Sequence, residues 1–131
     1  MYLTYYGLKE KPFQITADPN FLWLGEKHKE ALSTLKYGIL ENKGFVLLTG
    51  EVGTGKTVLI NQVLKEITEP YLLLNGEDIA TRELFNRRSV ANFLQLLEGK
   101  LFLVIDEAQK IPDIGNSLKL MIDETKGLRI L

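Results

Sequence analysis

Apolar residues follow two patterns along the chain. Four short runs are almost entirely apolar and lie next to glycine, proline or charged residues: 45–49, 71–75, 101–105 and 128–131. Such runs predict strands that are buried on both faces of a sheet. In other stretches apolar residues recur every three or four positions, as expected of helices with one buried face. We therefore predict helices at residues 26–40, 57–67, 81–97 and 114–125.

The order of these elements predicts an α/β fold. Strands that alternate with helices form right-handed crossovers, which give a mostly parallel sheet with helices on both faces. Residues 1–20 mix aromatic and turn-forming residues, and we expect an irregular lead-in that packs against the body of the domain. The length of 131 residues suits one domain. We divide it into the lead-in with the first helix (1–44) and the α/β core (45–131).

A glycine-rich segment follows the first predicted strand. It reads GEVGTGKT and matches the pattern G-x-x-x-x-G-K-[ST] of phosphate-binding loops, or P-loops. Glycines let successive backbone N–H groups turn toward one anion, and the helix that follows adds the positive end of its dipole. We predict that this segment binds the phosphates of a nucleotide through Gly50, Glu51, Val52, Gly53, Thr54, Gly55, Lys56 and Thr57.

Two side chains of this segment carry further chemistry. Lys56 would reach the β- and γ-phosphates, and the hydroxyl of Thr57 would take one position around Mg²⁺. The alternative is an ordinary glycine-rich turn with a surface lysine. The apolar strand before the segment and the amphipathic helix after it favour the P-loop.

The third predicted strand ends in an acidic pair, within LFLVIDE (101–107). Asp106 would hold Mg²⁺ through water, as a Walker-B carboxylate does, so Thr57 and Asp106 are the candidate metal ligands. Glu107 would orient and polarise the attacking water and is the candidate catalytic residue. The alternative is a solvated pair that caps the strand. A GTPase would usually carry D-x-x-G here, whereas this chain has DEAQ, which favours an ATPase, with ATP and Mg²⁺ as the expected cofactors.

The composition excludes several other classes of protein. The formal net charge of −1 argues against a strongly basic nucleic-acid-binding module. The lack of cysteine excludes disulfides and thiolate metal sites and makes the cytoplasm the expected location. His28 is the only histidine, which excludes paired-histidine metal sites. No apolar run approaches the about 18 residues of a membrane-spanning helix, so we predict no transmembrane segment.

Several other residues carry weaker signals. His28 is predicted to lie on a solvated helix face, with a contact to nucleotide as the alternative. Trp23 is predicted to be a core residue rather than a stacking platform for a base. Gln109 would either sense the γ-phosphate or cap the strand. A nucleic-acid partner would rest on residues 86–88 (Asn-Arg-Arg) and on Lys9, Lys11, Lys27 and Lys29, which we interpret as exposed polar residues.

The first part of the chain resembles a known family. The sequence YYGLKEKPFQITADPNFLWLGEKHKEALSTLKYGI, continuing through KGFVLLTGEVGTGKT, is similar to the N-terminal part of ExeA/GspA-type AAA ATPases of general secretion. Related transposition ATPases of the TniB and MuB kind share this lead-in. The similarity covers residues 1–57. It implies that the region from Phe13 to about His28 helps to wall an adenine site.

The remainder of the chain resembles another branch of AAA-type ATPases. Residues 58–131, above all the run from IDEAQKIP through SLKLMIDE, are similar to bacterial and archaeal AAA ATPases that carry a C-terminal domain of unknown function. We therefore expect a hybrid chain, such as an engineered one, that is joined near Thr57, with a divergent natural chain as the alternative. Both parents share the ATPase core, so the predicted site is the same for either.

Both resemblances imply a three-layer P-loop NTPase core with sheet order 1-4-3-2, where the predicted strands are counted along the chain. They also imply a fifth strand, a helical lid, a polar sensor and an arginine finger, which have no counterpart up to Leu131, so we expect a truncated core. The strand at 45–49 would then form an exposed apolar edge. Such an edge invites pairing with another chain, and we expect a homodimer.

Three functions remain open at this point. The first is an ATPase, which would be slow here because an arginine finger contributes about 10³–10⁵ to the rate. The second is a module that binds ATP, ADP or phosphate without turnover. The third is a folded fragment or fusion with no ligand. We predict ATP binding with weak or no hydrolysis.

Overall fold

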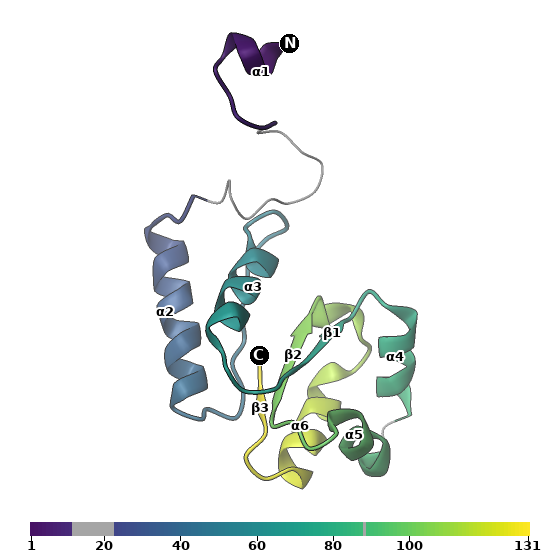
Figure 1. Ribbon diagram of the computed structural model, residues 1–131. Helices are drawn as coiled ribbons and strands as arrows, with labels where there is room; N and C mark the ends of the chain where they lie inside the picture. The colour runs from purple at the N-terminus through teal and green to yellow at the C-terminus, as the bar shows by residue number, and fades with distance from the viewer. Residues whose placement is uncertain (12–22, 88) are drawn as a thin grey trace.

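A parallel sheet forms the centre of the molecule, in a computed structural model that describes residues 1–11, 23–87 and 89–131 (Figure 1). Its strands are β1 (Leu72–Asn75), β2 (Phe102–Asp106) and β3 (Arg129–Ile130), in the spatial order β1-β2-β3. The segment 45–49 lies beyond β3 and joins it through one parallel bridge, from Phe45 to Ile130. This arrangement is the predicted order 1-4-3-2 and confirms the α/β fold.

Helices lie on both faces of this sheet (Figure 1). One face is covered by α2 (Glu26–Leu40) and α3 (Lys56–Glu66). The other face is covered by α4 (Ile79–Asn86), α5 (Val90–Leu97) and α6 (Ile114–Glu124). Two short elements complete the described chain, α1 (Tyr2–Tyr5) near the N-terminus and the 3₁₀ helix η2 (Ala108–Lys110) after β2.

The central strand β2 divides its side chains between two apolar clusters. Phe102 and Val104 pack among residues of α2 and α3, whereas Leu103 and Ile105 pack with α5 and α6. Successive side chains of a strand point to opposite faces, so a strand between two helical layers must be apolar at every position. All four side chains are buried. Each contributes roughly 1.5–3 kcal/mol relative to an exposed position, and the prediction of a buried central strand is confirmed.

The segment 45–49 differs from its prediction as a strand buried on both faces. Val46 and Leu48 pack into the cluster around α2 and α3, but Phe45 is 48% exposed and Leu47 is 68% exposed. The neighbouring strand β3 offers only two residues for pairing, so regular strand geometry ends after the bridge at Phe45. The prediction is therefore wrong for the outer face of this segment.

Two other predictions also need correction. The single helix predicted at 81–97 is two helices, α4 and α5, and the second begins after Ser89, whose hydroxyl accepts a hydrogen bond from the amide of Asn92 at 3.4 Å. Serine favours such a capping position over a helix interior, which explains the break. The strand β1 lies at the edge of the sheet, so Leu73 is 46% exposed rather than buried.

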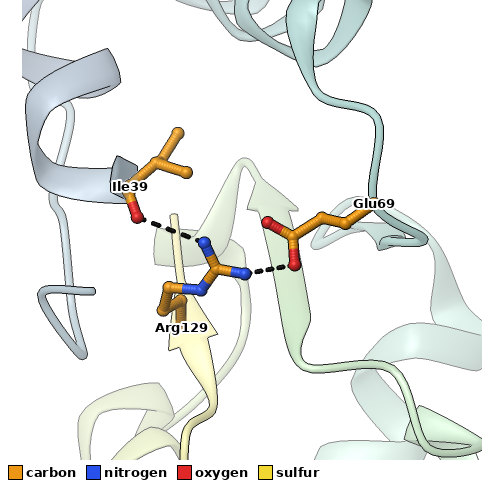
Figure 2. A network of polar contacts seen from close by, with 3 residues as sticks. All are labelled: Ile39, Glu69 and Arg129. Carbon is orange, nitrogen blue, oxygen red and sulfur yellow. Dashed lines mark hydrogen bonds and ion pairs between the residues drawn. The ribbon is translucent and has the colours of Figure 1, made fainter. Parts of the chain in front are cut away.

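Arg129 of β3 connects three parts of the fold (Figure 2). Its Nη1 donates to the carbonyl oxygen of Ile39 near the end of α2 at 3.1 Å, and its Nη2 pairs with the carboxylate of Glu69. The guanidinium also lies 5.5 Å from the centre of the Phe102 ring. The planar group can bond in several directions at once, which suits this junction. Arg129 thus ties α2, the loop before β1 and the sheet together.

The described part of the lead-in contains no buried residue. In α1 and the residues after it, Tyr5 is 82% exposed and Tyr6 is 69% exposed. In Figure 1 these residues lie apart from the α/β body. The expected packing of the lead-in is therefore not found in residues 1–11, and residues 12–20 lie outside the described chain. No helix among the described residues has the length and apolar character needed to cross a membrane.

Candidate functional site

The glycine-rich turn at 50–57 joins the segment 45–49 to α3. Gly53 and Gly55 have φ angles of 82° and 87°, a left-handed conformation that favours glycine. A Cβ atom on Gly50 would lie 2.7 Å from the hydroxyl oxygen of Thr54, so a side chain there would force the turn to shift. The backbone conformation thus favours glycine at 53 and 55, and the close approach of the Thr54 side chain favours it at 50.

The turn leaves several backbone amides without a protein acceptor. Thr54 donates to the carbonyl oxygen of Glu51 at 3.3 Å, which closes the tip of the turn. The amides of Gly53, Gly55, Lys56 and Thr57 make no hydrogen bond within the described part of the chain. Lys56 and Thr57 begin α3, where the first amides of a helix point away from its body and carry its positive partial charge. These donors suit a polyphosphate.

The side chain of Lys56 folds back across the same turn. Its Nζ donates to the carbonyl oxygens of Gly50 at 2.6 Å and of Glu51 at 2.9 Å. An ammonium group has three N–H donors, so one remains for a ligand. The two carbonyl contacts fix the ammonium beside the unpaired amides, which is where the sequence predicts the phosphates.

The predicted metal ligands contact each other. The hydroxyl of Thr57 donates to Oδ2 of Asp106 at 2.8 Å, and the amide of Glu107 donates to Oδ1 at 2.9 Å. Hydroxyl and carboxylate oxygens are hard donors, and Mg²⁺ is usually bound through one or two carboxylates together with phosphates and water. No group of three or more acidic or histidine residues that could hold a metal occurs among the described residues. The hydroxyl of Thr57 and the carboxylate of Asp106 fit Mg²⁺ that is bound together with phosphates.

Glu107 lies directly beside this pair, in a left-handed conformation with φ 53°. Its Oε2 accepts a hydrogen bond from Nε2 of Gln109 at 2.5 Å, so the carboxylate is held by the η2 turn. Gln109 holds the carboxylate of Glu107, and its two predicted roles, a γ-phosphate sensor or a strand cap, stay predictions. The acidic pair and its neighbour form one hydrogen-bonded unit with Thr57.

Gly76 is part of the site, although the sequence analysis did not single it out. It follows β1, and its amide donates to the carbonyl oxygen of Asp106 at 2.8 Å. A Cβ atom at this position would lie only 2.1 Å from the carbonyl oxygen of Glu107. Gly76 thus lets the end of β1 approach the acidic pair. Its position directly after a predicted strand was the available signal in the sequence.

His28 and Trp23 depart from their predictions. The Nε2 atom of His28 lies 2.9 Å from the carbonyl oxygen of Thr54, so His28 contacts the glycine-rich turn rather than only solvent. Trp23 is 83% exposed and is not a core residue. The implied adenine wall, from Phe13 to His28, lies mostly outside the described residues. Arg87 is exposed, and Arg88 lies outside the described chain.

A separate depression lies at the opposite end of the sheet. Its volume is about 510 Å³, and it is lined by residues that precede the strands, among them Gly44, Leu101 and Leu128. It shares no residue with the turn at 50–57 or with the acidic pair. Ligands of open α/β sheets bind at the carboxyl ends of the strands, where the turn and the acidic pair lie.

Comparison with protein-family models matches residues 42–131 to an AAA domain. The match covers more than half of the chain and includes the glycine-rich turn, the acidic pair and all three strands. The chain belongs to the AAA domain family. The match is continuous from residue 42 to residue 131 and so includes Thr57, near which we expected a junction between two parent sequences.

A curated relative supports the same assignment. The AAA chain is 34% identical over 160 aligned residues to General secretion pathway protein A of Aeromonas hydrophila. All of the chain is aligned, but it spans only 29% of that protein's length. The similarity is thus not limited to residues 1–57, and the hybrid origin stays a prediction. No solved structure matches the chain.

Proposed function

We propose that this AAA domain binds ATP together with Mg²⁺ at the turn 50–57. The observation that carries the proposal is the turn itself, in which the amides of Gly53, Gly55, Lys56 and Thr57 have no acceptor in the described chain. A lysine ammonium with one N–H to spare lies beside them. Donors without protein partners, at the start of a helix, favour a bound anion.

Each residue of the site has a proposed role in binding. The backbone of residues 50–57 holds the phosphates, and Lys56 neutralises part of their charge. Thr57 and Asp106 hold Mg²⁺, which would screen the negative charge between neighbouring phosphates when it is bound. General secretion pathway protein A, which aligns with the whole chain, is by its name a protein of a secretion pathway. For this chain, a part in secretion is a proposal only.

We also propose that hydrolysis is slow in the 131-residue chain. Glu107 is the base that would polarise the attacking water, and its carboxylate contacts Gln109. Arg129 is engaged by Glu69 and Ile39, and none of the described arginines contacts the turn. An arginine at the phosphates contributes about 10³–10⁵ in rate, so we expect less than about one turnover per minute without one.

Binding without turnover is the second candidate function. It is favoured by the contact between Glu107 and Gln109, because a carboxylate held by an amide is less available to water. A fusion fragment without any ligand is the remaining alternative. A fragment without a ligand would not explain why the amides of the turn have no acceptor or why Gly53 and Gly55 have positive φ angles.

The partners follow from exposed features of the fold. Phe45 and Leu47 leave an apolar edge beside β3, and we propose that two copies pair there. Sedimentation should then show a dimer in the parent and a monomer in Leu47→Lys. The same ratio of monomer to dimer in the parent and in Leu47→Lys would contradict this proposal. A cytoplasmic location stays a prediction from the lack of cysteine. A nucleic-acid partner has only the weak support of residues 86–88 and of Lys9, Lys11, Lys27 and Lys29, and the net charge argues against it.

The test of the binding proposal is calorimetric titration with Mg·ATP. Lys56→Ala should weaken binding by roughly 10- to 100-fold, because hydrogen bonds from charged groups contribute about 1.5–3 kcal/mol. Lys65→Ala, an exposed lysine near the end of the same helix, is the matched control and should bind as the parent does. A parent that binds no tighter than Lys56→Ala would refute the proposal. Phosphate release, measured in parallel, tests the slow turnover.

A further inference from the structure

His28 reaches the P-loop from a different element of the fold. It lies in the first turn of α2, 26 positions before Thr54, and its Nε2 is 2.9 Å from the carbonyl oxygen of that residue. A carbonyl oxygen only accepts hydrogen bonds, so the imidazole donates through Nε2–H. This bond is the contact by which the side chain of His28 holds the turn.

The bonded carbonyl fixes the direction of a neighbouring amide. The carbonyl of Thr54 and the N–H of Gly55 belong to one peptide plane, and in a trans peptide the two groups point in opposite directions. The described chain contains no cis peptide. A bond that holds the carbonyl toward His28 therefore holds the N–H of Gly55 away from His28.

This peptide lies in the glycine-rich part of the turn, where the amide and the hydroxyl of Thr54 both donate to the carbonyl oxygen of Glu51. Gly53 and Gly55, on either side of Thr54, both have positive φ angles. Glycine passes readily between positive and negative φ, so the glycines alone do not hold the peptide in one orientation. A donor from outside the turn is a physical means of holding it.

We propose that His28 is a positioning residue for phosphate binding. By donating to the carbonyl of Thr54, it keeps the N–H of Gly55 directed toward the phosphates, and it does not touch them itself. The inference rests on the proposed function, since it concerns the same site. Two other roles compete with it: a direct contact to the base of the nucleotide, and a purely structural link between α2 and the turn.

Three variants of His28 separate these roles. His28→Ala and His28→Leu remove the donor, whereas His28→Gln keeps an amide N–H at similar reach. Ser33→Ala, exposed on the same helix, is the matched control. Each protein is titrated with Mg·ATP and with tripolyphosphate, which carries the phosphate chain without a base. Thermal unfolding of each variant is followed by circular dichroism.

The positioning role predicts equal losses for both ligands. His28→Ala and His28→Leu should weaken Mg·ATP and tripolyphosphate by the same factor, about 3- to 10-fold, as expected for one hydrogen bond. His28→Gln should restore most of the affinity. Ser33→Ala should bind as the parent does, and all variants should unfold at nearly the same temperature.

Other results overturn the proposal. A loss for Mg·ATP but not for tripolyphosphate would assign His28 to the base. Unchanged binding in both donor-less variants, no rescue by glutamine, or a loss that follows a lowered unfolding temperature would also exclude it. If the parent binds neither ligand and Lys56→Ala changes nothing, the proposed function fails and the inference fails with it. A parent that binds, with a weakened Lys56→Ala and an unchanged His28→Ala, refutes the inference alone.

Discussion

The hydroxyl of Thr57 donates a hydrogen bond of 2.8 Å to the carboxylate of Asp106, although 49 positions separate the two residues. One residue lies in the first turn of α3 and the other ends β2. The parallel sheet brings these two points together at the carboxyl ends of its strands. The glycine-rich turn and the acidic pair thus form one site.

From this contact we predict that the effect of Mg²⁺ on the affinity for ATP depends on Thr57. Thr57→Ala removes one of the two proposed Mg²⁺ ligands but leaves the backbone amides, so it should abolish most of the tightening that Mg²⁺ gives to ATP binding. Binding of ATP in the presence of EDTA should change little. Thr57→Ser keeps the hydroxyl and is the matched control. Titrations with and without Mg²⁺ measure the difference, and equal Mg²⁺ dependence in Thr57→Ala and the parent would exclude Thr57 as a ligand.

Gly76 predicts a large effect from a small substitution. A Cβ atom there would lie 2.1 Å from the carbonyl oxygen of Glu107, and a backbone atom cannot move aside cheaply. Gly76→Ala should lower the free energy of unfolding by about 1–3 kcal/mol, the range found for overpacked sites.

The control for Gly76 is another glycine of the same chain. A Cβ atom on Gly115, in α6, would meet nothing within 4 Å. Gly115→Ala should therefore stabilise the fold by roughly 0.5–1 kcal/mol. Urea unfolding of both variants measures the changes, and a destabilisation of similar size in each would contradict the close approach at Gly76.

The contacts of Arg129 lead us to predict that this side chain stabilises the packing of α2 on the sheet. Arg129→Ala removes the bonds to Ile39 and Glu69 and the contact with Phe102, so unfolding should become easier by about 2 kcal/mol. Arg129→Lys should recover only part of this, because lysine has no planar fork. Arg87→Ala, at an exposed arginine, should be neutral. Unfolding curves that coincide for Arg129→Ala and Arg87→Ala would show that the network contributes no stability.

We predict that a substitution of Glu107 lowers the rate of ATP hydrolysis but leaves the affinity for ATP unchanged. Glu107→Gln keeps the shape of the side chain but removes the proposed base, so Mg·ATP should bind as in the parent. The slow release of phosphate should fall by about 10²-fold or more, within the range for a general base. Single-turnover assays with labelled ATP provide the sensitivity. Unchanged phosphate release would assign the base to another group.

Part of this architecture was predictable because it depends on local pattern. The spacing of apolar residues predicted α2 with the bounds that the structure has, and the run Phe102–Ile105 predicted the central strand. Prediction failed where distant residues decide the outcome. The pairing of 45–49 depends on the two residues of β3, and the contact of His28 with Thr54 joins elements that share no periodic signal.

The candidate site shows the same division. The motif alone indicated the residues from Gly50 to Thr57 and the acidic pair, since their chemistry requires those residue types at those places. Gly76 and Gln109 act through their positions next to Glu107, and only the register of β1 against β2 and the turn after β2 bring them there.

The central claim is that the unpaired amides of the turn bind the phosphates. NMR spectra of the backbone amides test this claim most directly. Addition of Mg·ATP to the ¹⁵N-labelled chain should shift the amide signals of Gly53, Gly55, Lys56 and Thr57 strongly, because these N–H groups gain charged acceptors. Amides of α5, which lies on the opposite face of the sheet from α3, should shift little. Signals of the turn that stay in place at saturating Mg·ATP, or shifts confined to other parts of the fold, would contradict the account.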